Sequence, residues 1–292
     1  MSYVKTEFAL AKPVWEPGRE NERNRSLIVS TVLDGADEAE LRLTGSSVYR
    51  VFVNRRLAYW GPARSGKGFF RVDEIPLGVF LHEGENIVAV EVTGYCCSSF
   101  EWMKHSSFLC AELIRGGAVL AATGAYGWQV FRNGRRLQKT PRFSFQRPFS
   151  EAYDHRAGRV EPTGWAVVPG GEWIERDLPD PSLAEEPVRC VVQTGDLVWR
   201  ADAPQCQNAF LVRAGKKFDG FPVEELEVNQ VGDALRYSQE NPCRSGASLP
   251  LTLPGNSFAT LKLAGNRTGL LRVCVQCMSD CDLYLCFDEL LT

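Results

Sequence analysis

Apolar and polar residues alternate in short runs along much of this chain. Tyr49, Val51 and Val53 occupy alternate positions of one run, and a second valine-rich run covers residues 87–92. A period of two is typical of a β-strand with one buried face. Shorter runs of the same kind predict further strands over residues 27–33, 40–43, 108–114, 118–122, 128–132 and 142–146. No amphipathic helical pattern interrupts them, so residues 1–156 are predicted to form a jelly-roll β-sandwich.

A stretch rich in proline and glycine, residues 157–187, separates this first domain from the rest. Its composition favours an ordered linker that runs along a surface. Beyond it, apolar residues alternate again over residues 249–253, 259–263, 271–275 and 283–287. These runs predict an antiparallel meander with one apolar face, and hence a second β-sandwich over residues 188–292. The predicted fold class is therefore all-β, with two antiparallel β-sandwich domains.

Composition narrows the classes of function. The 292 residues carry a formal net charge of −3, so no overall field favours nucleic acid or anionic lipid as a partner. Residues 1–20 contain no apolar core of signal-peptide length, and no apolar run is long enough to span a membrane. We therefore expect a cytoplasmic protein with no nucleic-acid or membrane partner.

Several motifs of the first half follow one another in an order known from other proteins. A strand ends in Val53-Asn54, and then come the loop 61–64 (Gly-Pro-Ala-Arg), the triplet 71–73 (Arg-Val-Asp) and 84–86 (Gly-Glu-Asn) before the next strand. This order resembles the sugar-binding-type, galactose-binding-like jelly rolls of glycoside hydrolases. In particular it is similar to the N-terminal region of glycoside hydrolase family 78, the α-L-rhamnosidases. The likeness extends to residues 107–112, 145–149 and 286–290.

The resemblance carries expectations of its own. Family 78 enzymes continue after such a Phe-Asp-Glu strand into a helical toroid with the catalytic acid and base, whereas this chain stops at Thr292. The resemblance thus implies the non-catalytic accessory half of a glycosidase, truncated before the catalytic domain or produced alone. The partners it implies are carbohydrate, with rhamnose-containing glycans as one candidate, and a glycosidase catalytic domain. One departure is Arg55, where such strands commonly turn on an Asn-Gly pair.

The residues themselves give little sign of catalysis. Glycoside hydrolysis normally needs two carboxyl groups that face each other across a cleft. The adjacent pairs Asp73-Glu74 and Asp288-Glu289 would instead point to opposite faces of a strand. The three histidines fall in polar turns or loops, and no nucleophile, phosphate-binding or dinucleotide motif occurs. We predict no catalytic residue in this chain alone.

Ten cysteines raise the question of a metal site. Four of them, Cys274, Cys277, Cys281 and Cys286, lie close together near the C-terminus. Structural zinc sites usually take a close pair of ligands from one turn and a second pair from elsewhere, whereas predicted strand positions point Cys274 and Cys277 to opposite faces. Free, buried thiols are therefore favoured over zinc, and no metal or cofactor is predicted.

Carbohydrate recognition needs flat apolar rings for pyranose faces and planar polar side chains for hydroxyl groups. Trp60, Arg64, Tyr95 and Trp102 offer both on loops predicted to lie at one end of the sandwich. The competing interpretation is that Tyr95 and Trp102 only pack the rim. A basic patch beside Trp60 also suits RNA, but the acidic chain argues against this partner.

The predicted function is carbohydrate binding, or support of a glycosidase catalytic domain. The alternative is a stand-alone lectin-like or protein-interaction module. A reading frame just downstream that encodes the helical catalytic toroid would favour the first function, and its absence would favour the alternative. A third hypothesis is an enzyme with an unrecognised site, which release of p-nitrophenol from aryl rhamnosides by the pure chain would support.

Overall fold

The computed structural model describes residues 3–142, 145–146, 148–156, 158–199, 219–228, 235–237, 249–266 and 269–287. In this part of the chain the regular structure consists of β-strands and two short 3₁₀ turns, which confirms the predicted all-β class. The chain divides into two compact units, one formed by Met1–Leu183 with Cys206–Asn229 and the other by Ala184–Gln205 with Gln230–Thr292.

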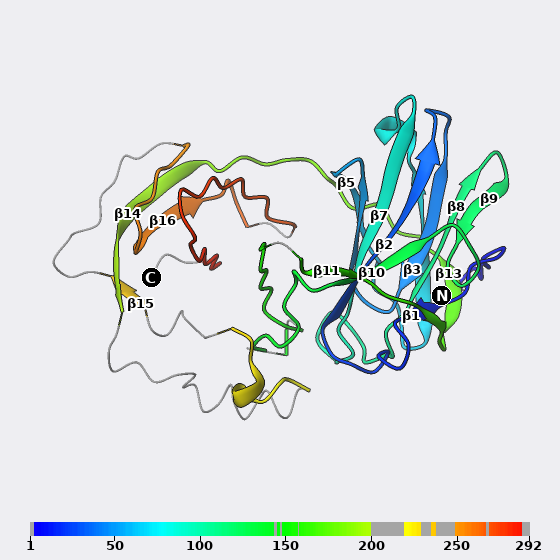
Figure 1. Ribbon diagram of the computed structural model, residues 1–292, viewed down its shortest axis with the longest axis horizontal. Helices are drawn as coiled ribbons and strands as arrows, with labels where there is room; N and C mark the ends of the chain where they lie inside the picture. Colours follow the sequence, from blue (N-terminus) through cyan, green and yellow to red (C-terminus); the bar gives the residue numbers. More distant parts are fainter. Residues whose placement is uncertain are drawn as a thin grey trace. The chain divides into compact units, whose positions relative to one another are not determined.

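The first unit is a sandwich of two β-sheets (Figure 1). The seven-stranded sheet has the order β12 (Ala166–Val167), β1 (Val14–Trp15), β8 (Leu109–Arg115), β3 (Glu40–Gly45), β6 (Phe69–Pro76) and β13 (Glu172–Glu175), with β9 (Ala118–Ala122) paired to β8. The six-stranded sheet has the order β11 (Val160–Pro162), β10 (Gln129–Asn133), β2 (Arg25–Asp34), β7 (Glu85–Gly94), β4 (Tyr49–Val53) and β5 (Arg56–Gly61). The 3₁₀ turn η1 (Gly78–Phe80) connects β6 to β7.

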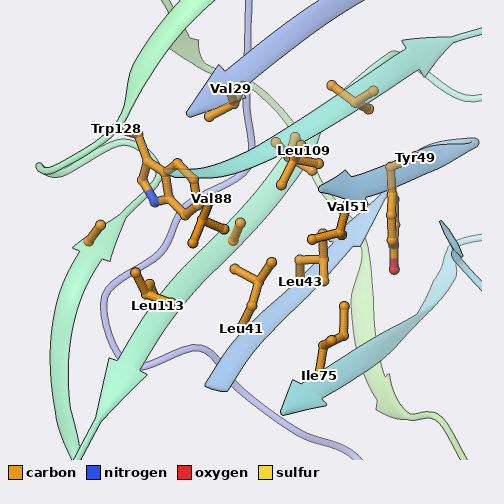
Figure 2. Packing of buried hydrophobic residues seen from close by; sticks show 14 of the residues in the cluster. Val29, Leu41, Leu43, Tyr49, Val51, Ile75, Val88, Leu109, Leu113 and Trp128 are labelled. Atoms are coloured by element: carbon orange, nitrogen blue, oxygen red, sulfur yellow. The ribbon is translucent and has the colours of Figure 1, made fainter. Parts of the chain in front are cut away.

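The core lies between these two sheets. Leu41, Leu43 and Leu113 extend from the seven-stranded sheet, and Val51 and Val88 from the six-stranded sheet, into one buried cluster (Figure 2). Each of these five side chains is at most 1% exposed. They occupy alternate strand positions, so the period of two in the sequence is what places them on the inner faces.

The outer face of the seven-stranded sheet is covered by the N-terminal segment. Glu112 on β8 is fully buried, and its carboxylate accepts hydrogen bonds from the backbone N–H groups of residues 9–11. Arg42 on β3 forms an ion pair with Glu112 at 3.2 Å and also lies over the ring of Phe8. A buried carboxylate needs such partners, so Glu112 anchors this segment to the sheet.

The proline- and glycine-rich stretch supplies three short strands to the sandwich. β11 pairs with β10, β12 pairs with β1, and β13 runs parallel to β6. Arg176, just after β13, donates to the buried carboxylate of Asp73 on β6. The segment is therefore held on both sheets of the first unit as far as this arginine. The jelly-roll topology and the boundary at residue 156 stay predictions.

The strand expected over residues 142–146 is not present at the described positions of that range, 142, 145 and 146. There Phe145 packs instead against Phe100, with ring centroids 5.3 Å apart. The expectation was wrong because an aromatic residue such as Phe145 can follow polar neighbours in a loop and pack on another loop.

The second unit contains a three-stranded antiparallel sheet of the order β15 (Leu235–Tyr237), β14 (Cys190–Trp199) and β16 (Ser257–Lys262). β16 matches one run of the expected meander. The other three runs of the expected meander do not form strands at their described residues, and no described strand pairs with them. These runs are 249–253, 271–275 and 283–287. Their apolar residues are exposed accordingly, for example Val273 at 46% and Leu285 at 51%. The second sandwich therefore stays a prediction, and Asp288-Glu289 lie outside the described residues.

Candidate functional site

The loops of the first unit collect at one end of the sandwich, which we call the loop end (Figure 1). β2, β4, β6 and β8 begin there, while β3, β5, β7 and β10 end there. Four loops and one distant segment meet at this end: residues 16–24, 62–68, 95–108, the described residues of 134–156, and residues 219–228. Strand ends of a rigid sandwich commonly carry the binding residues, so this end is the first place to look for a site.

An aromatic cluster lies within the loop end. Tyr95 packs against Trp102 and Phe149 with ring centroids 6.4 Å apart in each case. Phe149 in turn contacts Phe221 at 5.5 Å. The Tyr95 ring is only 7% exposed, and burial raises the pKa of its hydroxyl to about 12. Tyr95 and Phe149 are therefore the buried part of this cluster, and the half-buried Trp102 and Phe221 pack against it.

A polar depression of about 550 Å³ lies beside this cluster. It shares Phe221 with the cluster, and its remaining wall consists of polar side chains: Arg19, Asn21, Glu22, Arg23, Arg25, Arg132, Gln138 and Lys139. Three separate segments supply these residues. The loop before β2 is joined to the loop after β10 by Gln138, whose amide nitrogen donates to Glu22 and to the carbonyl of Arg23.

Glu16 lies behind the depression and holds two of its arginines. Its carboxylate accepts from Arg25 Nε at 2.5 Å and from Arg132 Nη2 at 2.7 Å. Burial alone would raise the pKa of Glu16, but these hydrogen bonds and positive charges outweigh it and lower the pKa to about 2. Glu16 is therefore ionised at neutral pH and fixes the orientation of both guanidinium groups.

The remaining cations of the wall are also neutralised. Arg19 pairs with Glu22 at 2.5 Å, Arg23 with Asp219 at 3.8 Å, and Lys139 with Glu225 at 3.1 Å. Each cation of the wall is thus paired with a carboxylate on or beside the wall, which leaves little net charge. A surface of this kind matches a ligand whose groups both donate and accept hydrogen bonds, and it has no excess charge for a phosphate or sulfate.

The four residues predicted for sugar binding do not form one group. Tyr95 and Trp102 are in contact, as described above. Arg64 is 64% exposed in its side chain and pairs with Glu101, the neighbour of Trp102, at 3.3 Å. Trp60 lies on β5 opposite Arg50, and among the described residues no hydrogen bond or ring contact links it to the other three.

Sequence reasoning missed the polar depression. Residues 16–25 have only the polar composition of an irregular segment, and residues 132–139 and 219–227 contain no motif. The only local signal is the density of polar and charged residues from Glu16 to Arg25, because all seven positions from Arg19 to Arg25 are arginine, glutamate or asparagine. Such density usually means a solvated loop, and only the fold brings it next to Gln138 and Phe221.

Two carboxylates near this end, Glu22 and Asp73, do not match the general acid of a glycoside hydrolase. A general acid for that reaction needs a raised pKa and access to substrate. Burial also tends to raise the pKa of Glu22, but hydrogen bonds from Arg19 and Gln138 leave it lowered, as at Glu16. Burial does raise the pKa of Asp73, yet Asp73 is fully enclosed and bonded to Tyr49 and Arg176.

The cysteines differ from expectation. Cys96, Cys97 and Cys110 are buried, whereas Cys274, Cys277, Cys281 and Cys286 are exposed, because the tail runs are not packed into a sheet. The prediction of buried thiols is therefore wrong for these four. In the described part of the chain, no three histidine, cysteine or carboxylate side chains converge as a metal ion would require. No described helix is long and apolar enough to cross a membrane.

Comparison with known proteins supports the relation to glycosidases. No protein-family profile matches the chain, and no curated protein matches it either. Among solved structures, the family 78 rhamnosidase of Bacillus sp. GL1 shares 25% sequence identity with it at a TM-score of 0.58, covering 67% of this chain and 23% of that one. The α-L-rhamnosidase of Aspergillus terreus matches at 15% identity, covering 68% of this chain and 28% of that one. Its TM-score of 0.45 is too low to support an argument.

The chain thus spans about a quarter of the length of the rhamnosidases it matches. The predicted resemblance to the N-terminal region of family 78 proteins is confirmed by the Bacillus structure. This likeness fits an accessory β-sandwich region.

Proposed function

We propose that this chain is a non-catalytic, carbohydrate-binding region of an α-L-rhamnosidase-like glycoside hydrolase, and that the sugar binds in the polar depression of the loop end. The observation that carries the proposal is the likeness to the Bacillus rhamnosidase at 25% identity over 67% of this chain. That similarity concerns 23% of the enzyme's length.

The chemistry of the depression supports a neutral sugar as its ligand. A sugar hydroxyl donates one hydrogen bond and accepts others, so it needs both kinds of partner close together. Arg19 and Lys139 offer donors, while Glu22 and the side-chain amide of Asn21 offer acceptors. Because arginine and glutamate hold one another in place, little side-chain entropy is lost when a sugar binds.

Phe221 supplies the apolar part of the same surface. Carbohydrates present C–H groups on their ring faces, and aromatic rings bind these faces. Phe149 and Tyr95 support the Phe221 ring from behind, and Trp102 completes this packing. In this proposal Tyr95 and Trp102 position the site, and Arg64, which pairs with Glu101, is not part of it.

The first test is calorimetric titration of the full chain with methyl α-L-rhamnopyranoside, with glucuronate as an anionic comparison. We expect binding of the neutral glycoside, and a loss of affinity of about tenfold or more in the R19A/K139A double variant, because each lost hydrogen bond to a charged group is worth about 1.5–3 kcal/mol. The matched control is Arg56→Ala, which removes a cation at the opposite end of the sandwich.

Two results would count against the proposal. Equal affinity of R19A/K139A and the unaltered chain would remove the depression as the site. Absence of binding to methyl α-L-rhamnopyranoside and to a panel of rhamnose-containing oligosaccharides would remove the carbohydrate role and leave only support of a catalytic domain.

A further inference from the structure

The two sheets of the sandwich differ in what covers their outer faces. The N-terminal segment lies across the seven-stranded sheet, as shown by Glu112 and Phe8. On the outer face of the six-stranded sheet, Val32 on β2 and Ile87 on β7 are 58% and 50% exposed. This face is therefore open at the end that Val32 and Ile87 occupy, whereas Tyr153 lies against Arg50 closer to the loop end.

A β-bulge determines which residues of β5 reach this face. Leu57 pairs with Phe52 of β4, but Tyr59 pairs with Val51, so Ala58 is the extra residue. Ala58 and Tyr59 are consequently both buried, and Tyr59 donates to Asp180 at 2.8 Å. The bulge shifts the alternation by one residue, which turns Trp60 to the outer face.

Trp60 lies directly across from Arg50 there. Cross-strand pairs of this kind have Cβ atoms about 4.5–5.5 Å apart, so the two side chains start from adjacent positions on this face. The Arg50 guanidinium itself lies 6.0 Å from the ring centres of Phe52 and Tyr153. On the other side of β4, Arg50 pairs in register with Glu91 of β7. Three adjacent strands thus place an aromatic ring, a cation and a carboxylate in one row.

The polar groups of this row are held in place but still accessible. Arg50 Nη2 donates to Glu91 Oε2 at 2.8 Å and to the Tyr153 hydroxyl at 3.0 Å. The Tyr153 hydroxyl donates onward to Glu151 at 2.8 Å. The side chains of Arg50 and Glu91 remain 30% and 28% exposed.

We propose that Trp60, Arg50, Glu91 and Tyr153, which we call the outer-face platform, form a second contact site for a neutral carbohydrate. One pyranose face stacks on the Trp60 indole, and its hydroxyl groups bond to Arg50 and Glu91. This inference rests on the proposed function that the chain binds carbohydrate, but it uses residues that are separate from the polar depression.

The composition of the platform favours a neutral sugar over the other ligands. Glu91 and the nearby Glu151 neutralise Arg50, so no positive charge is left to attract a phosphate or a nucleic-acid backbone. The half-buried ring beside fixed planar groups suits a small rigid polyol. A protein partner that covers the whole sheet face would instead depend mainly on Val32 and Ile87.

The test compares three variants of the full chain by calorimetry with methyl α-L-rhamnopyranoside and methyl β-D-galactopyranoside as probes. In the R19A/K139A background, which disables the depression, we expect residual binding that Trp60→Ala weakens by about tenfold or more. Trp60→Phe keeps a ring and restores part of the affinity. Val32→Ala, on the same face, is the control and binds as its parent does.

The outcomes separate this inference from the proposed function. Residual binding that Trp60→Ala leaves unchanged, with melting temperatures equal throughout, would overturn the platform while the depression stands. Complete loss of binding in R19A/K139A alone would overturn it as well. If instead Trp60→Ala affects only capture of a glycosidase catalytic domain and not sugar affinity, the face is a protein contact and the inference is wrong.

Discussion

Four polar side chains, Asn54, Asp73, Asn86 and Glu112, contact other parts of the sandwich rather than solvent. Asn54 donates to Asn86 at 2.8 Å, and Asn86 donates to the carbonyls of Gly35, His82 and Gly84. Asp73 joins Tyr49 on the opposite sheet to Arg176, and Glu112 holds residues 9–11. All four belong to the motifs through which the sequence resembles family 78 proteins. These motifs therefore indicate how the sandwich is held together, and they carry little information on which sugar would bind to it.

Glu16 gives a prediction at this scale. Its pKa is about 2 in the folded chain against an ordinary value of 4.5, so its charge stabilises the fold above pH 4.5. This contribution is lost as the pH falls from 4.5 towards 2. We expect the free energy of unfolding to drop by about 2 kcal/mol over this range because of Glu16 alone, after allowing for solvent screening.

Chemical denaturation of the unaltered chain and of Glu16→Gln between pH 2 and 5 measures this contribution. The glutamine variant lacks the titrating group, so its stability is expected to be lower at pH 5 and to change less with acid. If the free energies of unfolding of the two proteins changed with pH in parallel, Glu16 would have no such role.

Tyr95 shows why site residues were only partly predictable from sequence. Its place after a predicted strand correctly put it at the loop end together with Trp102. Its burial depends on Phe149 and on Arg136, whose guanidinium lies 5.8 Å from the ring centre. Both are more than forty positions away in the chain, and no local pattern indicates their approach.

At the scale of elements, alternation predicted the long strands well because each has one face in the core. β2, β4 and β7 match their predicted runs to within two residues. The short strands β11, β12 and β13 were not predicted, because two to four residues are too few to show a period. The bulge at Ala58 was not predicted either, since a one-residue shift is set by pairing between strands.

The turn between β4 and β5 gives a prediction for an element. Asn54 and Arg55 have φ of +51° and +66°, the left-handed region that a two-residue hairpin turn of type I′ requires. Arg55 thus adopts the conformation in which related strands use glycine. Arg55→Gly should raise the free energy of unfolding by about 0.5 kcal/mol, because relief of the strained φ exceeds the added entropy of the unfolded chain.

Thermal and denaturant unfolding measure this difference. The matched control is Arg56→Gly, at the start of β5, where glycine gains nothing from φ and should cost about 0.5–1 kcal/mol. A loss of stability in Arg55→Gly equal to that in Arg56→Gly would show that the turn is not strained.

At the scale of the whole molecule, the proposed function depends on the arrangement of the loop end. The wall of the depression comes from residues 19–25, 132–139 and Phe221, which the fold of the first unit brings together. The net charge of −3 gave no indication of the five cations on one wall, each of which is paired with a carboxylate. Long-range pairing of this kind cannot be read from composition.

The most direct measurement is an NMR titration of the isotope-labelled full chain with methyl α-L-rhamnopyranoside, with the sugar signals recorded in the same samples. We expect amide shifts concentrated at residues 19–25, 132–139 and Phe221, while the glycoside signals show no release of free rhamnose. Shifts that avoid the loop end, or the appearance of free rhamnose, would contradict a non-catalytic carbohydrate-binding region.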